Sequence, residues 1–211
     1  VISRTADACF MPLTVGGGVR DVGDFRKLLL CGADKVSVNS SAVKDPDLIS
    51  RAADKFGSQC VVVAIDAHLH DEGWFEVTTH GGRTPTGINA IDWAVAAAAK
   101  GAGEILLTSI DREGTWKGFD LDLVRRVVEN VSIPVIAHGG AGSINHIAEV
   151  VKKANASAVA PANPVKTFPS HNDLTFFAFA LMNGIMILGW SFLISVNDGF
   201  VLLTQVQNSS V

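Results

Sequence analysis

The stretch VVVAID, residues 61–66, decides the fold. Four of its first five residues are β-branched and the other is alanine, a composition that predicts a strand buried on both faces. The apolar run stops at Asp66, so we expect this carboxylate where the buried strand ends. Loops after the carboxyl ends of parallel strands form the active-site face of α/β folds, which makes Asp66 a candidate for proton transfer. The alternative is that Asp66 only caps a turn.

A second run, ILLTSID at residues 105–111, is built in the same way and also ends in aspartate. Two buried strands that each end in an acid indicate one architectural unit used repeatedly, with its chemistry on one rim.

Composition sets limits on the class of protein. The 211 residues are 48% hydrophobic, enough for one large α/β core, and the net charge of -4 argues against a general nucleic-acid binder. Cys9, Cys31 and Cys60 stand in apolar contexts without metal-ligand spacing. We therefore expect free thiols in a reducing, cytoplasmic compartment and no metal site.

A glycine loop follows the first predicted strand. The strand FMPLTV, residues 10–15, leads directly into Gly16, Gly17 and Gly18. Glycines let backbone amides approach a ligand closely, and an anion is the ligand that exposed amides favour. Flexible turns also use such glycines, so this loop alone is a weak signal.

An internal repeat strengthens that signal. Residues 12–18, PLTVGGG, align with residues 134–140, PVIAHGG, which places Gly17 and Gly18 on Gly139 and Gly140. In each half the glycine loop and the polar end of the following strand would form one anion site: GADKVSVNS, residues 32–40, matches NASAVAPAN, residues 155–163. Two such sites on one rim suit an elongated substrate with a phosphate at each end, with Asp66 between them.

The remaining pattern is that of βα units. Apolar periodicity predicts helices over residues 21–31, 46–56, 91–100 and 121–130, and residues 68–80 predict a small β-hairpin. GGRTPTG, residues 81–87, is predicted as a loop that either folds over substrate or is a plain surface excursion. Strands near residues 12, 36, 62, 106, 134 and 158 number six, whereas a closed barrel has eight. The fold class predicted is an incomplete α/β (βα)8 TIM barrel whose first two units are missing.

Several motifs together resemble one family. PLTVGGGVRD, GADKVSVNS, FGSQCVVVAIDA, HGGRTPTG, GAGEILLTSIDREGT and IPVIAHGGAG are similar to the cyclase subunit of imidazole glycerol phosphate synthase, of histidine biosynthesis, over about residues 1–163. The related phosphoribosyl-formimino isomerase of the same pathway shares the half-barrel repeat and both phosphate sites. TSIDREGT looks like the cyclase version of its loop.

The resemblance implies an activity. A βα barrel would take ammonia from a glutaminase partner and convert a bisphosphorylated substrate to imidazole glycerol phosphate and an aminoimidazole carboxamide ribotide, without a cofactor. Asp66 matches one of the family's two catalytic aspartates, which act as general acid and base. The other aspartate belongs to a first strand that this sequence does not contain, so we expect the chain alone to be nearly inactive. The alternatives are the related isomerase and a non-catalytic fragment that binds phosphate or docks the glutaminase.

The resemblance also implies site residues, some of which depart from the family. Gly18, Asn39 and Ser40 match one phosphate site; Glu113, Gly114, Gly140, Ala162 and Asn163 match the other; Thr14, Thr108 and His138 match further rim positions. Glu113 stands where the family usually has aspartate and His138 where it has serine. Pro161 and Pro164 interrupt a run that is usually alanines and an aliphatic residue.

On the opposite face the resemblance implies a route for ammonia. Lys35 and Glu104 match half of the charged gate through which ammonia enters, and Asp34 and Gln59 match positions that face the glutaminase. Without the family match, the polarity of surface positions and strand starts would account for them.

From about residue 165 the sequence diverges. We therefore divide the chain into a partial barrel, residues 1–165, and a hydrophobic tail, residues 166–211, in which residues 174–196 carry no charge. That stretch predicts a possible membrane-like helix, since about 20 apolar residues span a bilayer, but it has no Lys/Arg flank. A membrane partner is not our main expectation; an anchor, an aberrant tail and a divergent core helix stay open.

We also expect unpaired strand edges at residues 12–15 and 156–159, which would favour association.

Overall fold

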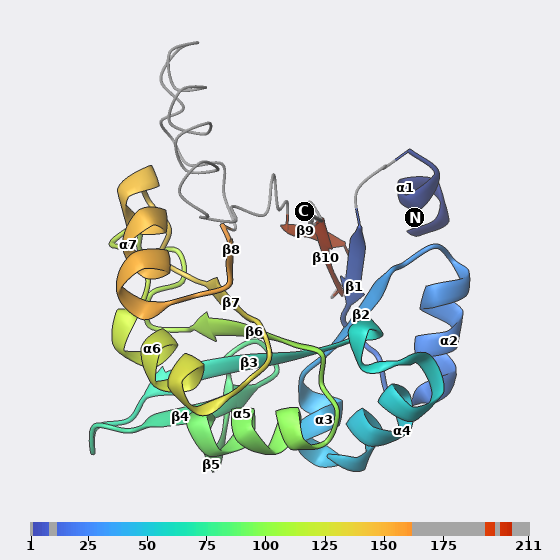
Figure 1. Cartoon of the computed structure of the whole chain (residues 1–211), viewed down its shortest axis with the longest axis horizontal. Coiled ribbons are helices and arrows are strands. Elements are labelled where there is room, and N and C mark those ends of the chain that lie inside the picture. The colour runs from blue at the N-terminus through green and yellow to red at the C-terminus, as the bar shows by residue number, and fades with distance from the viewer. Residues whose placement is uncertain (1, 9–11, 162–192, 197–198, 204–211) are drawn as a thin grey trace.

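The core of the protein is a curved parallel sheet, described here from a computed structural model for residues 2–8, 12–161, 193–196 and 199–203 (Figure 1). Six strands run parallel in the order β8-β7-β6-β3-β2-β1. They are β1 (Leu13–Gly16), β2 (Lys35–Val38), β3 (Val61–Leu69), β6 (Glu104–Ser109), β7 (Val135–His138) and β8 (Ala158–Ala160). The sheet curls into a half-barrel, so the prediction of an incomplete (βα)8 barrel is confirmed.

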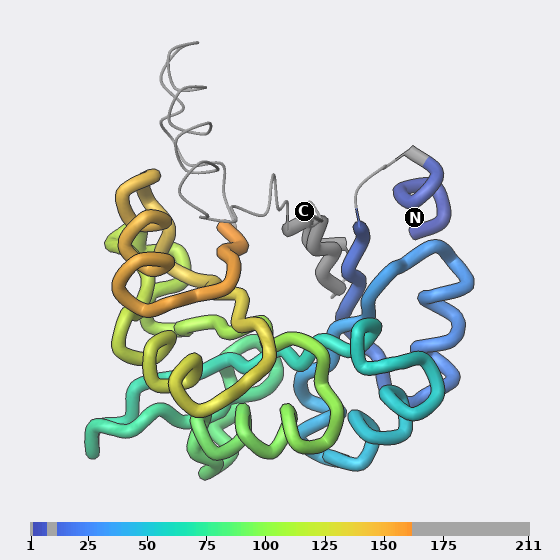
Figure 2. The backbone as a smooth tube through the Cα atoms, in the orientation of Figure 1, coloured from blue at the N-terminus to red at the C-terminus, as the bar shows by residue number. Residues whose placement is uncertain are grey.

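Helices cover the outer side of this arc, which Figure 2 shows running from β1 around to β8. They are α1 (Ile2–Ala8), α2 (Val22–Leu30), α3 (Ser40–Lys44), α4 (Asp47–Phe56), α5 (Ala90–Ala99), α6 (Leu121–Asn130) and α7 (Ile144–Ala154), with a 3-10 turn η1 (Ser58–Cys60) before β3. The four predicted helices are confirmed to within a residue. We did not predict the short α3 or α7.

Side-chain caps fix where several helices begin. Asp21 accepts a hydrogen bond from the Asp24 amide at the start of α2, and Asp120 accepts one from the Leu123 amide at the start of α6. Such caps satisfy amide groups that have no partner inside the helix. Each capping residue lies just before the apolar periodicity starts, so the sequence indicates both helix starts.

Alternation along the strands separates two faces. Val63 and Ile65 of β3 belong to the main core packed against the helices, whereas Ile136 and Ala158 belong to a separate cluster on the inner face. Successive side chains of a strand point to opposite faces, so Asp66 lies on the inner face with Ile136. The inner face therefore carries the polar ends of the strands.

The strand that contains Asp66 is longer than predicted. β3 continues to Leu69 because its last residues pair antiparallel with β4 (Phe75–Thr79), Asp66 opposite Thr78. The hairpin predicted for residues 68–80 is therefore confirmed as the end of β3 with β4. β4 also pairs with β5 (Thr84–Asn89), which includes residues 84–87 of the segment that we predicted as a loop, residues 81–87. Asp66 is thus the last inner-face residue of β3 that pairs in the parallel sheet, although β3 itself continues to Leu69.

Part of the divergent tail adds two antiparallel strands. β10 (Gly199–Leu203) pairs with β1, and β9 (Leu193–Val196) pairs with β10. The expectation of an unpaired edge at residues 12–15 is therefore wrong, because β1 has a partner on each side. Residues 193–196, the last of the predicted helix 174–196, form a strand, while residues 174–192 lie outside the described residues. Within the described ranges, no helix has the length and apolar character needed to cross a membrane.

Candidate active site

A row of inner-face side chains crosses three strands at the carboxyl-terminal rim. In the parallel register Asp66 of β3 pairs with Thr108 of β6, and Thr108 pairs with His138 of β7. Thr108 and His138 are 7% and 8% exposed. Because partners in register point to the same face, three polar side chains lie next to one another at one level of the half-barrel.

Asp66 is the partly buried acid of this row. Its Oδ2 accepts a hydrogen bond from Asn39 Nδ2 at 2.9 Å, and Thr108 donates a second side-chain hydrogen bond. Burial raises the pKa of the Asp66 carboxyl above its usual value, and the negative charge of Glu113 adds to the increase. The two hydrogen bonds lower the pKa and offset part of that rise. A shift in this direction favours the protonated form of the carboxyl, and a carboxyl at such a rim can act as a general acid or base.

Unsatisfied polar atoms concentrate at the same rim. Among the described residues, the buried side-chain atoms without a hydrogen-bond partner are Asn39 Oδ1, Ser109 Oγ, both ring nitrogens of His138, and Trp93 Nε1. Asn39 and His138 lie at the carboxyl ends of β2 and β7 on the inner face, whereas Ser109, which alternates with Thr108, lies on the opposite face with Ala67. Each such group costs about 1–3 kcal/mol of desolvation. Polar groups left unpaired at one place are typical of a binding site that a ligand completes.

His138 faces a second carboxylate. Its Nδ1 lies 3.7 Å from Oε2 of Glu113, which comes from the loop after β6. Burial lowers the pKa of the His138 imidazole, and the charge of Glu113 acts in the opposite direction. The protonation of this ring is therefore set by two opposing effects, burial and a neighbouring charge.

The two glycine loops adopt matching backbone conformations. Gly17 and Gly18 have φ angles of 94° and 70°, and Gly139 and Gly140 have 93° and 94°. A Cβ on Gly139 would lie 2.7 Å from the Ser109 carbonyl oxygen, and one on Gly140 would lie 2.3 Å from the Gly118 carbonyl oxygen. Only glycine fits such a conformation and such a close approach. The repeat predicted from the sequence is therefore present in the backbone.

The other predicted phosphate-site residues differ in what they contact. Thr14 is 3% exposed in β1, and the Ser40 hydroxyl accepts a hydrogen bond from the His80 amide at 3.3 Å. The Glu113 amide donates to the Ser109 carbonyl at 3.0 Å, whereas a Cβ on Gly114 would meet nothing within 4 Å. Ala162 and Asn163 lie outside the described residues.

The amino-terminal end of the inner face carries charges of its own. Lys35 at the start of β2 forms an ion pair with Glu104 at the start of β6, and their side chains are 16% and 21% exposed. Asp34 Oδ2 accepts a hydrogen bond from the Leu13 amide at 2.7 Å, which holds the start of β1. Gln59 is exposed, and its side chain donates to the Phe56 carbonyl at 3.4 Å.

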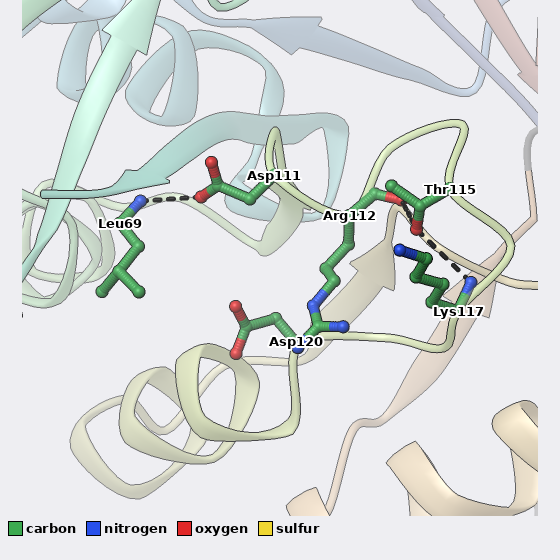
Figure 3. Close-up of a pocket in the computed structure, with 6 residues that line it drawn as sticks. All are labelled: Leu69, Asp111, Arg112, Thr115, Lys117 and Asp120. Atoms are coloured by element: carbon green, nitrogen blue, oxygen red, sulfur yellow. Dashed lines mark hydrogen bonds between the residues drawn. The ribbon is translucent and has the colours of Figure 1, made fainter.

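Asp111, the second acid found at the end of an apolar run, has a different position from Asp66. Its carboxylate contacts His68 Nδ1 at 2.6 Å and accepts a hydrogen bond from the Leu69 amide at 2.8 Å. It thereby ties the loop after β6 to the extension of β3. Figure 3 shows the contact of Asp111 with the Leu69 amide at one side of a pocket. The pocket has a volume of about 270 Å³ and is also lined by Arg112, Thr115, Lys117 and Asp120. The two acids therefore do not share one site.

Sequence reasoning alone did not identify the contact between Asn39 and Asp66 or the unpaired hydroxyl of Ser109. Ser109 follows Thr108 directly in the TSID segment, so the polar end of that strand was the available signal. In the part of the chain that the structure describes, no group of three or more His, Cys, Asp and Glu side chains is arranged to hold a metal ion.

A curved parallel sheet with a partly buried acid on the carboxyl-terminal rim defines the class of βα-barrel enzymes, whose chemistry takes place at that rim. A comparison with protein families identifies the particular family: the one described as histidine biosynthesis protein matches residues 1–163. The chain belongs to that family.

Proposed function

We propose that the chain acts as the cyclase subunit of imidazole glycerol phosphate synthase, with Asp66 as its proton-transfer group. The observation that carries this proposal is the partly buried Asp66 carboxyl, bound by Asn39 and Thr108 at the rim. Burial raises the pKa of this carboxyl and so favours its protonated form. Asp66 would donate a proton to the substrate and take one back as the imidazole ring closes.

The two glycine loops would hold the phosphates of a bisphosphorylated substrate. Gly17 and Gly18 lie after β1, and Gly139 and Gly140 lie after β7, on opposite sides of the strand that carries Asp66. Backbone amides in positive-φ turns form concave sites that favour anions. An elongated substrate with a phosphate in each loop would place its central part over Asp66.

The ion pair at the other end of the inner face supports the cyclase assignment over the related isomerase. Ring formation by the cyclase needs ammonia, and Lys35 and Glu104 occupy the end of the half-barrel opposite Asp66. Ammonia from a glutaminase subunit docked near Asp34 and Gln59 would pass this pair. The isomerase reaction uses no ammonia, so a paired charge at this place would serve only stability.

We expect slow turnover. Proton transfer in both directions is faster with an acid and a base on opposite sides of the substrate, and the inner row of the described residues supplies one carboxyl, Asp66. Binding of the substrate depends on the loops and not on the second acid. A chain that binds the bisphosphate without converting it is therefore the second candidate, supported by the intact conformation of the loops.

The test combines binding with the identity of the product. The chain, in molar excess, is mixed with phosphoribulosyl-formimino-AICAR phosphate with and without ammonium, and separately with the ribosyl isomer that the isomerase uses. Binding is followed by tryptophan fluorescence, because Trp116 lies in the loop after β6. We expect saturable binding and slow, ammonia-dependent release of imidazole glycerol phosphate.

Two results would contradict the proposal. Conversion of the ribosyl isomer without ammonia would identify the isomerase. A lack of saturable binding would show that the glycine loops do not hold the phosphates of the substrate. Saturable binding with no product after prolonged incubation at high protein concentration would favour the non-catalytic candidate.

A further inference from the structure

His138 is a buried polar side chain that makes no hydrogen bond with the described residues. It ends β7 on the inner face, between Thr108 of β6 and Ala160 of β8 in register. The residue is 8% exposed, and neither ring nitrogen has a hydrogen-bond partner among the described residues. An imidazole always has at least one N–H to donate, so a group that completes this site must accept a hydrogen bond.

The surroundings of the ring define where that group would lie. His138 directly precedes Gly139 and Gly140, whose backbones approach the carbonyls of Ser109 and Gly118 too closely for any side chain. The loop after β7 is therefore held tightly against the loop after β6. A ligand held by the amides of this glycine loop lies beside the ring that begins it.

Charges around the ring decide how its proton behaves. Among the described residues, the titratable side chain in contact with His138 is Glu113, whose Oε2 is 3.7 Å from Nδ1. The strands on either side present Thr108 and Ala160, which carry no charge, and Asp66 is one strand further along the row. One imidazole nitrogen thus faces a carboxylate, and the other is available to a ligand.

We propose that His138 contacts an oxyanion held by the Gly139–Gly140 loop, and that it takes up a proton when the anion binds. In the complex Nδ1–H faces the Glu113 carboxylate and Nε2–H donates to the anion. A doubly protonated ring is required for both contacts at once, because a neutral imidazole has one N–H. This inference rests on the proposed function, since it assigns the specificity of one of its two phosphate loops.

Burial and the anion pull the protonation of the ring in opposite directions. In the unliganded protein burial lowers the pKa of His138, while Glu113 raises it. A bound anion adds a second negative charge and shifts the ring toward its charged form. Affinity for the anion must therefore fall as the pH rises through the pKa of the complex, and thermodynamic linkage limits the slope to about tenfold per pH unit for one proton.

Inorganic sulfate is the probe, because its charge does not change between pH 5.5 and 8.5 and any pH dependence then comes from the protein. The full chain is titrated by calorimetry at constant ionic strength, in two buffers that differ in ionisation enthalpy, so that proton uptake is counted directly. We expect affinity to fall by up to about tenfold per pH unit toward alkaline pH. We also expect uptake of up to one proton per sulfate.

Substitutions separate His138 from other titrating groups. His138→Gln keeps a hydrogen-bond donor but cannot take up a proton, so we expect weaker sulfate binding with a flat pH profile. Glu113→Gln should move the profile to lower pH. Asp66→Asn should leave the slope in place, and His68→Gln is the matched control for replacing a histidine away from this loop. Should His138→Gln fail to fold, the Cε1–H resonance of His138 in the wild type gives the same information, because sulfate should raise its pKa.

The outcomes distinguish this inference from the proposed function. A pH-independent affinity for sulfate, or the same slope in His138→Gln as in the wild type, would overturn the role of His138 even if the bisphosphate substrate binds and reacts. Proton-linked sulfate binding that His138→Gln abolishes would sustain this role even if the ammonia-dependent product never forms.

Discussion

Removing one partner of the Lys35–Glu104 ion pair should destabilise the protein by about 2 kcal/mol. Breaking a fully buried pair costs about 3–5 kcal/mol, because the remaining charge is left uncompensated. Here the side chains are 16% and 21% exposed, so water recovers part of that loss, and roughly half of it should remain. We expect Lys35→Met and Glu104→Gln each to lower the free energy of unfolding by this amount.

A double-mutant cycle in urea at pH 7 and low salt measures the coupling. The double variant should be less destabilised than the sum of the single variants by about 1–2 kcal/mol, since neither charge is then left alone. The matched control is the exposed pair of Lys27 and Asp24, with side chains 77% and 28% exposed, for which Lys27→Met should cost less than about 0.5 kcal/mol. Additive losses, or losses no larger than in the control, would refute the reasoning that the half-barrel holds this pair away from water.

Three further outcomes follow from the geometry. Since burial raises the pKa of Asp66, the folded protein holds this proton more tightly than the unfolded chain, and wild-type stability declines above the usual value of 3.8. Asp66→Asn should therefore gain stability relative to the wild type as the pH rises, and the difference in free energy of unfolding should be constant at lower pH. Urea titrations across pH measure this difference, and a relative stability of Asp66→Asn that falls as the pH rises would contradict the reasoning. Gly139→Ala should lower the melting temperature more than Gly18→Ala. Both positions have a positive φ, which costs an alanine about 1–2 kcal/mol, but only at Gly139 would the new Cβ also lie 2.7 Å from a carbonyl oxygen. Equal shifts in melting temperature would contradict this. Asp111→Ala should speed hydrogen exchange at the Leu69 amide, which it binds at 2.8 Å, and unchanged exchange would disprove the tie.

The fold followed from local patterns because the central strands are apolar runs and two of the helices begin at capping aspartates. VVVAID and ILLTSID predict buried strands without reference to any other residue, and Asp21 and Asp120 mark helix starts by their own hydrogen bonds. The glycine repeat was visible for a similar reason, since positive φ angles restrict the residue type at those positions.

Pairing between strands accounts for the strand ends and edges that the sequence did not predict. β3 extends beyond Asp66 because β4, which follows a turn, pairs with it, and no pattern within residues 61–66 records that partner. The edge of β1 is covered by β10, more than 180 residues away in the chain. Asp66 and Asp111 end similar apolar runs, yet one lies on the inner row and the other ties two loops together. Face and register, set by tertiary pairing, decide which acid belongs to the site.

The central claim is that Asp66 transfers protons at the rim of a histidine-biosynthesis half-barrel, and a single-turnover rate tests it most directly. Wild type and Asp66→Asn, each in excess over phosphoribulosyl-formimino-AICAR phosphate and supplied with ammonium, are compared by the rate at which imidazole glycerol phosphate forms. Positioned acid–base groups contribute about 10²–10⁴-fold, so the variant should be at least about a hundredfold slower while it binds the substrate with similar affinity. Equal rates in the two proteins would contradict the claim.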